Sequence, residues 1–432
     1  MRSLIARLHG LPPEGEEYDR TFMESFIRPG LDRKAWHARN MKPAKGVVQT
    51  GDALTVQVDL INAADGTQAW GSRYTRSRSA VYELPPSIAV DLVKKLDLKL
   101  TNEQARRLEK KYTENAEAYS LFYLGRLYWN KRSEEALKKS IEYFEQAIEQ
   151  DPNFALAYAG LADSYAVMAI SADLPPREVY PKALAAATKA LELDDGLVEA
   201  RATMLRIRSQ YEWNWQAAEV EYRRALEQNP NYPMTHIYYI SSLISAGRAD
   251  EAVVSAQRAQ QLDPLSFVAN AVVARALFFA GRYDDAIVQA RKTLEMDENV
   301  FLARLILGRS LARKGYFDAA IDELEKARQV PGANSESTSL LAHTFGVTGR
   351  TAEARRLLAK MQQLSAGRYV QPYDIAIVHA GLGDKDAALE WLEKAFQERN
   401  HQVPLIAYVP EFESLRSDPR FIALIERVRN GS

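Results

Sequence analysis

Five glycines recur at intervals of 34 residues in the second half of the chain. Five alanines keep the same interval, each standing five positions after a glycine. Two registers kept over five copies indicate one structural unit repeated in tandem, because each unit of such an array buries its apolar face against its neighbours. The glycines are Gly247, Gly281, Gly315, Gly349 and Gly383, and the alanines are Ala252, Ala286, Ala320, Ala354 and Ala388.

Each repeated position has a physical reason. The glycine follows an apolar helical stretch, such as HIYYISSLISAG, where a residue in the left-handed conformation ends the first helix of the unit, helix A. The alanine lies in the first turn of the second helix, helix B, where a small side chain lets the two helices approach closely. A second small residue follows seven positions later on the same face: Ala225, Ala259, Thr293, Ala327 or Ala395.

Pairs of antiparallel helices at a period of 34 residues are typical of the tetratricopeptide repeat (TPR). Pro152, Pro230 and Pro264 follow the ends of helix B, where proline cannot continue a helix. The predicted fold class is therefore mainly α, a right-handed TPR α-α superhelix of about eight repeats with a small α+β amino-terminal piece. The units are placed at residues 118–152, 155–195, 198–230, 233–264, 267–298, 301–332, 335–366 and 369–400.

The first three units carry longer loops between helix A and helix B, at residues 130–134, 170–181 and 211–216. Two interpretations stay open: the insertions serve binding, or they are loop variation that costs little free energy. The array is expected to close with a cap at residues 403–432. There Ser417 or Asp418 can cap a last helix that has Pro419 in its first turn and an apolar face of Phe421, Leu424, Ile425 and Val428.

Ahead of the repeats the periodicity changes to that of strands. In ALTVQVDLI the apolar residues alternate with polar ones, which predicts a half-buried strand. A strand at 47–50 joins it through Gly51-Asp52, and Ala64-Asp65-Gly66 turns into a third strand through Trp70 and Tyr74. A helix follows, with Ile88, Leu92, Val93 and Leu96 on one side.

The runs VVQTGDALTVQVDLINAADGTQAWGSRY and YTENAEAYSLFYLGRLYWNKR resemble bacterial proteins that join a TolB-like amino-terminal domain to tetratricopeptide repeats. The resemblance covers about Val47 to Val428. It implies a division into an unassigned segment (1–46), a partial TolB-like α+β domain (47–112), a TPR solenoid (113–402) and a carboxy-terminal cap helix (403–432). In that family these modules often follow a winged-helix DNA-binding domain, a serine/threonine kinase domain or a nucleotide cyclase domain. One hypothesis is therefore a sensory or regulatory arm of a bacterial signalling protein whose output domain is missing from this chain.

Composition and motifs exclude several other functions. Lys and Arg total 56 and Asp and Glu total 57, a balance unlike that of proteins that coat nucleic acid or anionic membrane. There is no cysteine, no phosphate-binding loop, no dinucleotide fingerprint and no nucleophile elbow, and the six histidines show no metal-binding pairing. We therefore predict no enzyme, no metal and no cofactor. Without a signal peptide or membrane segment, the expected location is the cytoplasm, or the periplasm if the chain derives from a membrane-tethered relative.

The remaining candidate for function is the concave face, which helix A of each unit lines in tetratricopeptide arrays. On this register the face is cationic with aromatic patches, and arginine can grip a carboxylate with two hydrogen bonds. We predict a non-catalytic scaffold or adaptor that binds a protein or peptide partner of acidic or acidic-hydrophobic character in this groove. The alternative is that an arginine on helix A pairs with a carboxylate of the next unit and that Phe278 fills an interface between units. The predicted groove residues are Arg206, Tyr238, Arg275, Phe278, Phe279, Arg309, Arg313 and His343.

Overall fold

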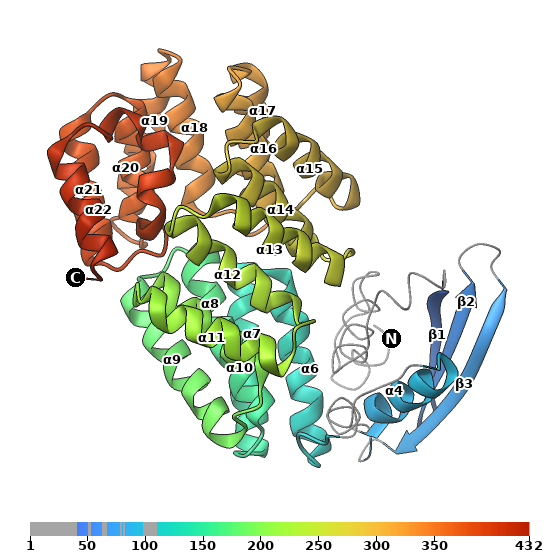
Figure 1. Cartoon of the computed structure of the whole chain (residues 1–432). Coiled ribbons are helices and arrows are strands. Elements are labelled where there is room, and N and C mark those ends of the chain that lie inside the picture. The colour runs from blue at the N-terminus through green and yellow to red at the C-terminus, as the bar shows by residue number, and fades with distance from the viewer. Residues whose placement is uncertain are drawn as a thin grey trace.

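The computed structural model describes residues 41–50, 53–62, 67–77, 80, 83–97 and 110–431. From residue 116 onward it consists of eight antiparallel helix pairs that stack side by side (Figure 1). The predicted TPR superhelix of about eight repeats with a small α+β piece is confirmed. The pairs are α6 (Ala116–Lys131) with α7 (Glu134–Gln150), α8 (Ala155–Ser171) with α9 (Pro176–Leu193), α10 (Val198–Gln210) with α11 (Trp215–Gln228), α12 (Pro233–Ser245) with α13 (Ala249–Leu262), α14 (Phe267–Phe279) with α15 (Tyr283–Met296), α16 (Phe301–Arg313) with α17 (Phe317–Ala327), α18 (Ser335–Val347) with α19 (Thr351–Leu364), and α20 (Pro372–Gly381) with α21 (Lys385–Gln397).

The repeated glycines end helix A as predicted. All five have φ between 72° and 81°, the left-handed region that an L side chain enters only at a cost. After Gly247 the Arg248 amide donates a hydrogen bond of 2.8 Å to the carbonyl of Leu243, which satisfies a free carbonyl of the last turn. The repeated alanines, Ala252, Ala286, Ala320, Ala354 and Ala388, and the second set of small residues, Ala225, Ala259, Thr293, Ala327 and Ala395, are 0% exposed. The close approach of helices A and B is therefore confirmed.

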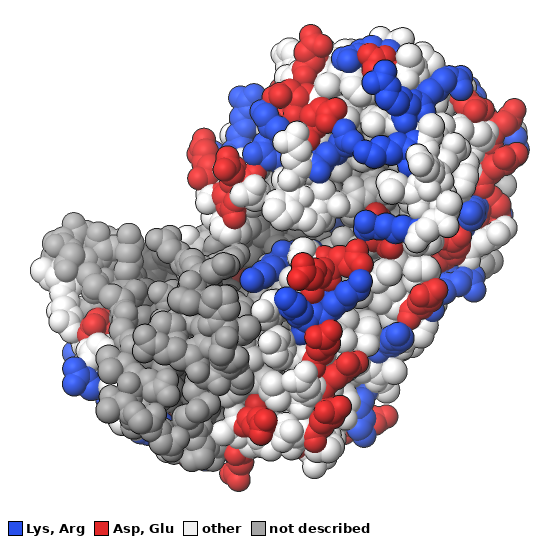
Figure 2. All heavy atoms as spheres, turned by 180° about the vertical axis from the view of Figure 1, so that it is seen from behind, with Lys and Arg blue, Asp and Glu red and all other residues white. Residues whose placement is uncertain are grey.

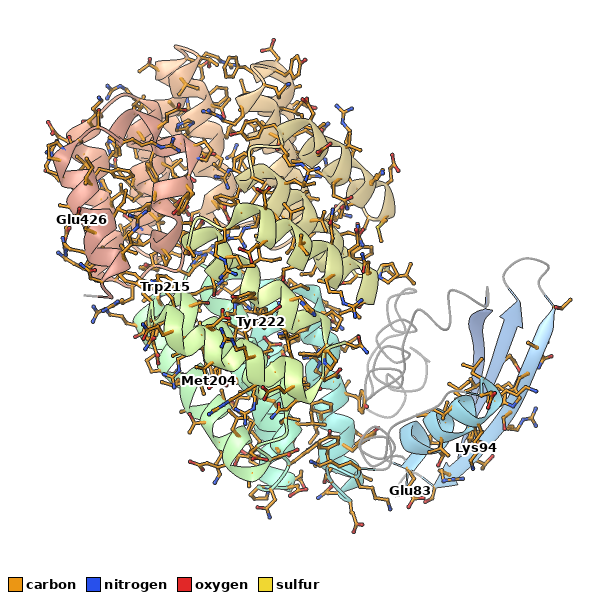
Figure 3. All side chains as sticks on the ribbon, in the orientation of Figure 1. Glu83, Lys94, Met204, Trp215, Tyr222 and Glu426 are labelled. Carbon is orange, nitrogen blue, oxygen red and sulfur yellow. The ribbon has the colours of Figure 1, made fainter. Side chains whose placement is uncertain are left out.

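The amino-terminal piece is a three-stranded antiparallel sheet in the order β1-β2-β3, with one helix against it. Val56, Val58 and Tyr74 of the sheet are buried, as are Ile88 and Leu92 of the helix. Figure 3 shows Glu83 and Lys94 at opposite ends of this helix. The elements are β1 (Met41–Thr50), β2 (Ala53–Asn62), β3 (Gln68–Ser77) and α4 (Leu84–Lys95).

Strand β1 begins earlier than the sequence pattern indicates. Its pairing with β2 runs from Thr50 opposite Ala53 to Met41 opposite Asn62, so it starts ahead of the predicted domain start at Val47. The segment MKPAKG has no apolar alternation, which is why periodicity misses it. The predicted turns at Gly51-Asp52 and Ala64-Asp65-Gly66, and most of the unassigned segment 1–46, lie outside the described residues.

The superhelix closes on itself, so that the carboxy-terminal helices lie next to the first repeats (Figure 1). The side chain of Arg177 on α9 donates hydrogen bonds to the carbonyl oxygen of Gln397, at the end of α21. Asn334 donates a 3.1 Å hydrogen bond to the carbonyl of Ile170, and Arg368 forms an ion pair with Glu134 at 3.3 Å. First and last repeats therefore touch across one turn of the array.

The longer loops of the first three repeats make this closure. The second loop is shorter than predicted, residues 172–175, because Pro176 opens α9 and Pro181 lies inside that helix. Its Asp173 accepts a 2.7 Å hydrogen bond from the hydroxyl of Ser335. The first loop lies against Gly332, where an added Cβ would be 3.0 Å from the Cα of Ser133. In the structure these two loops contact residues 332–335, across the closure of the array.

The third loop contributes Trp213, which stands 34 residues before Gly247 and so occupies the glycine position of its repeat. Trp213 adopts φ 55°, and its side chain is 1% exposed. Its ring packs on Phe396 of α21, with centroids 5.1 Å apart, and under the guanidinium of Arg399 at 4.3 Å. Position 213 thus has the left-handed backbone of the repeat glycine, and its indole side chain joins the third repeat to the end of the array.

Among the helices of the described residues, none is long and apolar enough to cross a membrane.

Replacing Trp213 with glycine should destabilise the fold even though it relieves the left-handed strain. Loss of a buried tryptophan costs about 3–5 kcal/mol, against about 1–2 kcal/mol of strain. We expect a net loss of about 2–3 kcal/mol in the free energy of unfolding, measured in urea. Gly281→Ala is the matched control, since no atom lies within 4 Å of its added Cβ, and it should cost only the strain. Equal or higher stability of Trp213→Gly would contradict the closing role.

Candidate functional site

The concave face of the superhelix is partly occupied by the chain's own carboxy-terminal segment. We call residues 400–418 the strap; it contains two short 3-10 helices, η2 (Val403–Tyr408) and η3 (Pro410–Leu415), which pack on helices α12 and α20. Burying one apolar side chain stabilises a fold by about 1.5–3 kcal/mol, so the buried apolar side chains of the strap together contribute on the order of 10 kcal/mol. The strap is thus a fixed part of the fold. Its buried apolar side chains are Val403, Leu405, Ile406, Val409, Phe412 and Leu415, all at most 2% exposed.

The strap ends in the predicted cap. The side chain of Asp418 accepts a hydrogen bond from the amide of Arg420, and Pro419 opens α22 (Pro419–Arg429). Phe421, Leu424 and Val428 are buried, which confirms the predicted apolar face. Residues 403–415 do more than cap the array, because they lie inside it.

Arg309 and Glu411 form the central ion pair between the array and the strap. Nε and Nη2 of Arg309 donate to the two carboxylate oxygens of Glu411 at 2.8 and 2.7 Å, and the side chains are 6% and 8% exposed. Burial alone would raise the pKa of Glu411, but the charge and hydrogen bonds of Arg309 outweigh it and hold that pKa below its ordinary value. His343 contacts the carbonyl oxygen of Glu411 at 3.3 Å.

A second pair, Arg313 with Glu413, lies at the rim. Its nitrogen and oxygen are 2.9 Å apart, but the side chains are 36% and 57% exposed, so water screens the attraction. Beside it is a pocket of about 340 Å³ lined by Arg313, Phe317, His343 and Val347 among others. Arg309 and Arg313 therefore pair within the chain, but with carboxylates of the strap; the alternative interpretation expected carboxylates of the next unit.

The two phenylalanines differ. Phe278 is 1% exposed and lies 4.4 Å from the guanidinium of Arg309, so it fills an interface, as the alternative interpretation holds. Phe279 is half-buried, with Arg275 and Arg309 at 5.8 and 5.6 Å from its ring centroid.

Arg206, Tyr238 and Arg275 have a different environment. Arg206 lies 4.6 Å from the ring centroid of Tyr238, and the Tyr238 hydroxyl donates to Asp163 at 2.5 Å. Within the described part of the chain, neither Arg206 nor Arg275 has a carboxylate oxygen within 4.0 Å. Burial lowers the pKa of Arg275 to about 10; Glu336 opposes this effect, and the charges of Arg309 and Arg206 add to it. The predicted groove is thus neutralised around Arg309 and cationic around Arg206.

Two residues near Arg206 and Arg275 are not among the groove residues predicted from the sequence. Arg132 ends α6 with φ 60° and stacks on Trp129 at 3.5 Å from the ring centroid. His401 belongs to the strap and is 8% exposed. A basic residue at the helix-ending position of the first repeat was a signal available in the sequence, whereas nothing there placed His401 inside the array. The pKa of His401 is lowered to about 3, first by burial and then by Arg206 and Arg275.

On the outer surface, lysine and arginine alternate with aspartate and glutamate over the face seen in Figure 2. The described convex helices thus carry no large patch of one sign on that face. The distinctive electrostatic feature is in the interior.

At the ring closure, Ser335 lies between two buried carboxyl groups. Its hydroxyl is 2.7 Å from Asp173 and 2.5 Å from Asp374, and one hydroxyl proton cannot serve both. Burial, reinforced by Glu336, raises the pKa of Asp374 well above its ordinary value. A protonated Asp374 can donate to Ser335, whose own proton then goes to Asp173.

Tetratricopeptide-repeat family models match residues 118–154, 274–334, and 336–360 with 376–394. Among solved structures, PilF of Pseudomonas aeruginosa is similar at 21% identity and a TM-score of 0.36, over 48% of this chain and 92% of that one. YrrB, described as a TPR protein with an unusual peptide-binding site, is similar at 23% identity and a TM-score of 0.29, over 44% and 93%. No curated protein matches the chain.

The chain therefore contains tetratricopeptide repeats, and repeats of this kind serve as protein-interaction scaffolds. The matched residues lie in the repeats, and the TolB-like resemblance stays a prediction. The same holds for partner binding by the eight groove residues.

Replacing Glu411 with glutamine should leave Arg309 charged and unpaired in a buried position. Breaking a buried ion pair on one side costs about 3–5 kcal/mol, and we expect that loss in urea unfolding. Glu413→Gln makes the same chemical change at the exposed pair and should cost less than about 0.5 kcal/mol. Similar losses for the two variants would mean that the strap is not held by the buried pair.

Replacing Asp374 with asparagine should give a stability gain that grows with pH. In the wild type the folded state keeps a proton that the unfolded chain releases above pH 3.8, so its stability falls as pH rises toward the raised pKa. Asparagine has no such proton. The difference in unfolding free energy should increase by about 1.4 kcal/mol per pH unit and then level off. A difference independent of pH between 4 and 8 would contradict a protonated Asp374.

Proposed function

We propose that the chain is a non-catalytic protein-binding scaffold whose concave face holds an acidic segment of a partner protein or peptide. The observation that carries the proposal is the strap. The strap is a chain segment with apolar and acidic residues, bound on the concave face through Arg309 and Glu411. It is an internal example of the ligand that this face accepts.

The part of the face assigned to the partner lies around Arg206, which is buried, and Arg275, which is half-buried. Tyr238 and Phe279 lie beside these arginines and offer aromatic contact area at low entropic cost. Arginine without a carboxylate of its own is suited to grip one from a partner. Arg309, Arg313 and His343 contribute indirectly, by holding the strap that forms one wall of the site.

A second candidate is the sensory or regulatory arm of a bacterial signalling protein. Its support is the α+β piece that precedes the repeats, where Lys111 pairs with Glu83 at 3.4 Å and Lys110 with Asp194 at 2.6 Å. Such a link would let the piece and the array move as one unit. An output domain encoded in frame upstream would favour this candidate, and an independent stop codon there would count against it.

The scaffold is tested by affinity capture with the full chain from its native cell, followed by titration of the purified partner. Wild type and Arg291→Glu should capture the same partner, because Arg291 is an exposed residue of the convex helix α15 in the same repeat. Arg275→Glu should weaken binding at least about tenfold, since a charge-assisted contact becomes a repulsion. Unchanged binding by Arg275→Glu would exclude the groove. Failure of the wild type to enrich any protein over an unrelated repeat array would count against a scaffold.

A further inference from the structure

The interior of the ring holds more positive than negative charge. The charged groups of the described residues that interact there include Arg126, Arg132, Arg206, Arg275 and Arg309, with Asp163, Glu336 and Glu411. Two of the arginines are neutralised: Arg309 by Glu411, and Arg126 by Asp163, whose oxygen is 3.7 Å away. The remaining arginines are Arg132, Arg206 and Arg275, and the remaining carboxylate is Glu336.

Contacts link the first part of this cluster. Arg126 and Arg132 stack on Trp129 at 4.3 and 3.5 Å from its ring centroid. Arg126 faces Asp163, which accepts the hydrogen bond of Tyr238, the residue on which Arg206 stacks. Arg132 and Arg206 therefore approach each other from the first and third repeats.

Arg275 completes the cluster from the fifth repeat. It shares the ring of Phe279 with Arg309, and its charge interacts with those of Arg206 and Glu336. The charge of Glu336 acts on Arg275 and that of Asp163 on Arg132; the pKa of Glu336 is raised by burial, which Arg309 and Arg275 oppose. Because buried unpaired charge costs several kcal/mol, this surplus needs an explanation.

Two buried nitrogens show where the surplus is concentrated. Nη1 of Arg206 and Nδ1 of His401 are inaccessible to water and have no hydrogen-bond partner among the described residues. The two side chains are 7% and 8% exposed, whereas Arg132 and Arg275 are half-buried. In folded proteins nearly all buried donors have a partner, and these two lie beside cations, so an anion bound there would give both an acceptor.

We propose that Arg206, Arg275 and His401, with Arg132 adding positive charge, form a binding site for an oxyanion. The inference rests on the proposed function and deepens it by naming the chemical group that the concave face recognises. A guanidinium can donate two parallel hydrogen bonds to a carboxylate or a phosphate. Arg309, on the helix A that follows the one carrying Arg275, binds Glu411 of the strap in this way. The neutral imidazole of His401 donates a further hydrogen bond from Nδ1 in the tautomer that carries its proton there.

Two sources can supply the oxyanion: free phosphate, or a carboxylate on a partner peptide. The full chain is therefore titrated with inorganic phosphate in one arm and with a blocked peptide of two glutamates in the other, in chloride buffer of matched ionic strength. Melting temperature and calorimetry are the measurements. Saturable stabilisation by either ligand supports the site, and the arm with the tighter binding identifies the source.

The variant Arg275→Gln distinguishes an oxyanion-binding role of Arg275 from a purely structural one. Arg275 forms no ion pair with the described residues, so removing its surplus charge should leave the melting temperature unchanged or higher without ligand. The same change should weaken oxyanion binding at least about tenfold, the effect of losing a charge-assisted hydrogen bond. A merely structural arginine would instead show a lower melting temperature and unchanged binding. Arg291→Gln, on the exposed helix face of the same repeat, should bind as the wild type does.

The proposal is overturned if neither ligand stabilises the wild type beyond the chloride control, or if Arg275→Gln responds as the wild type does. These outcomes are separate from those of the scaffold experiment. A captured partner that binds without either small ligand binding would leave the scaffold standing and remove the oxyanion site. Phosphate binding without any captured protein would do the reverse.

Discussion

The burial of the strap inside the superhelix is the interaction on which the rest of the structure depends. Repeat arrays are ordinarily held by contacts between neighbouring units, so their stability is close to a sum of local terms. Here residues 400–418 pack on the fourth and eighth repeats and bind Arg309 of the sixth through Glu411. Together with the contacts of Trp213 and Asp173 across the closure, these long-range interactions couple the ends of the array. Such an array should unfold more cooperatively than an open solenoid.

The strap also divides the concave face. Around Arg309 its glutamates neutralise the arginines and its apolar side chains fill the space, at a gain too large for a weakly bound ligand to reverse. Around Arg206 and Arg275 the strap brings His401, a neutral side chain, and no carboxylate among the described residues. The strap thereby makes the groove around Arg309 part of the core, whereas the groove around Arg206 and Arg275 keeps its positive charge.

The register of the repeats could be predicted because it is local. A glycine that ends helix A and an alanine that lets helix B approach act within one unit, and Gly247 and Ala252 do what their positions require. The closure could not be predicted in the same way, since it depends on the accumulated rotation of eight units. Trp213 and Arg132 at helix-ending positions were the visible signs, because a bulky residue there needs a compensating contact. Glu411 carries no periodic signal, and its pairing with Arg309 is a contact across about a hundred residues.

The retained charge is the feature that fold stability alone does not explain. Well-packed apolar residues in place of a buried ionic group are often neutral or stabilising, so an array selected only for stability would carry none of these arginines. Trp129, Tyr238 and Phe279 stack on the guanidinium groups and recover part of the desolvation cost, but an aromatic ring supplies no negative charge. Arg132, Arg206 and Arg275 are therefore held in place without an ion pair to the described residues. That arrangement is expected of a preorganised anion site. Placing the arginines together costs folding free energy, and a bound anion would recover that free energy as affinity.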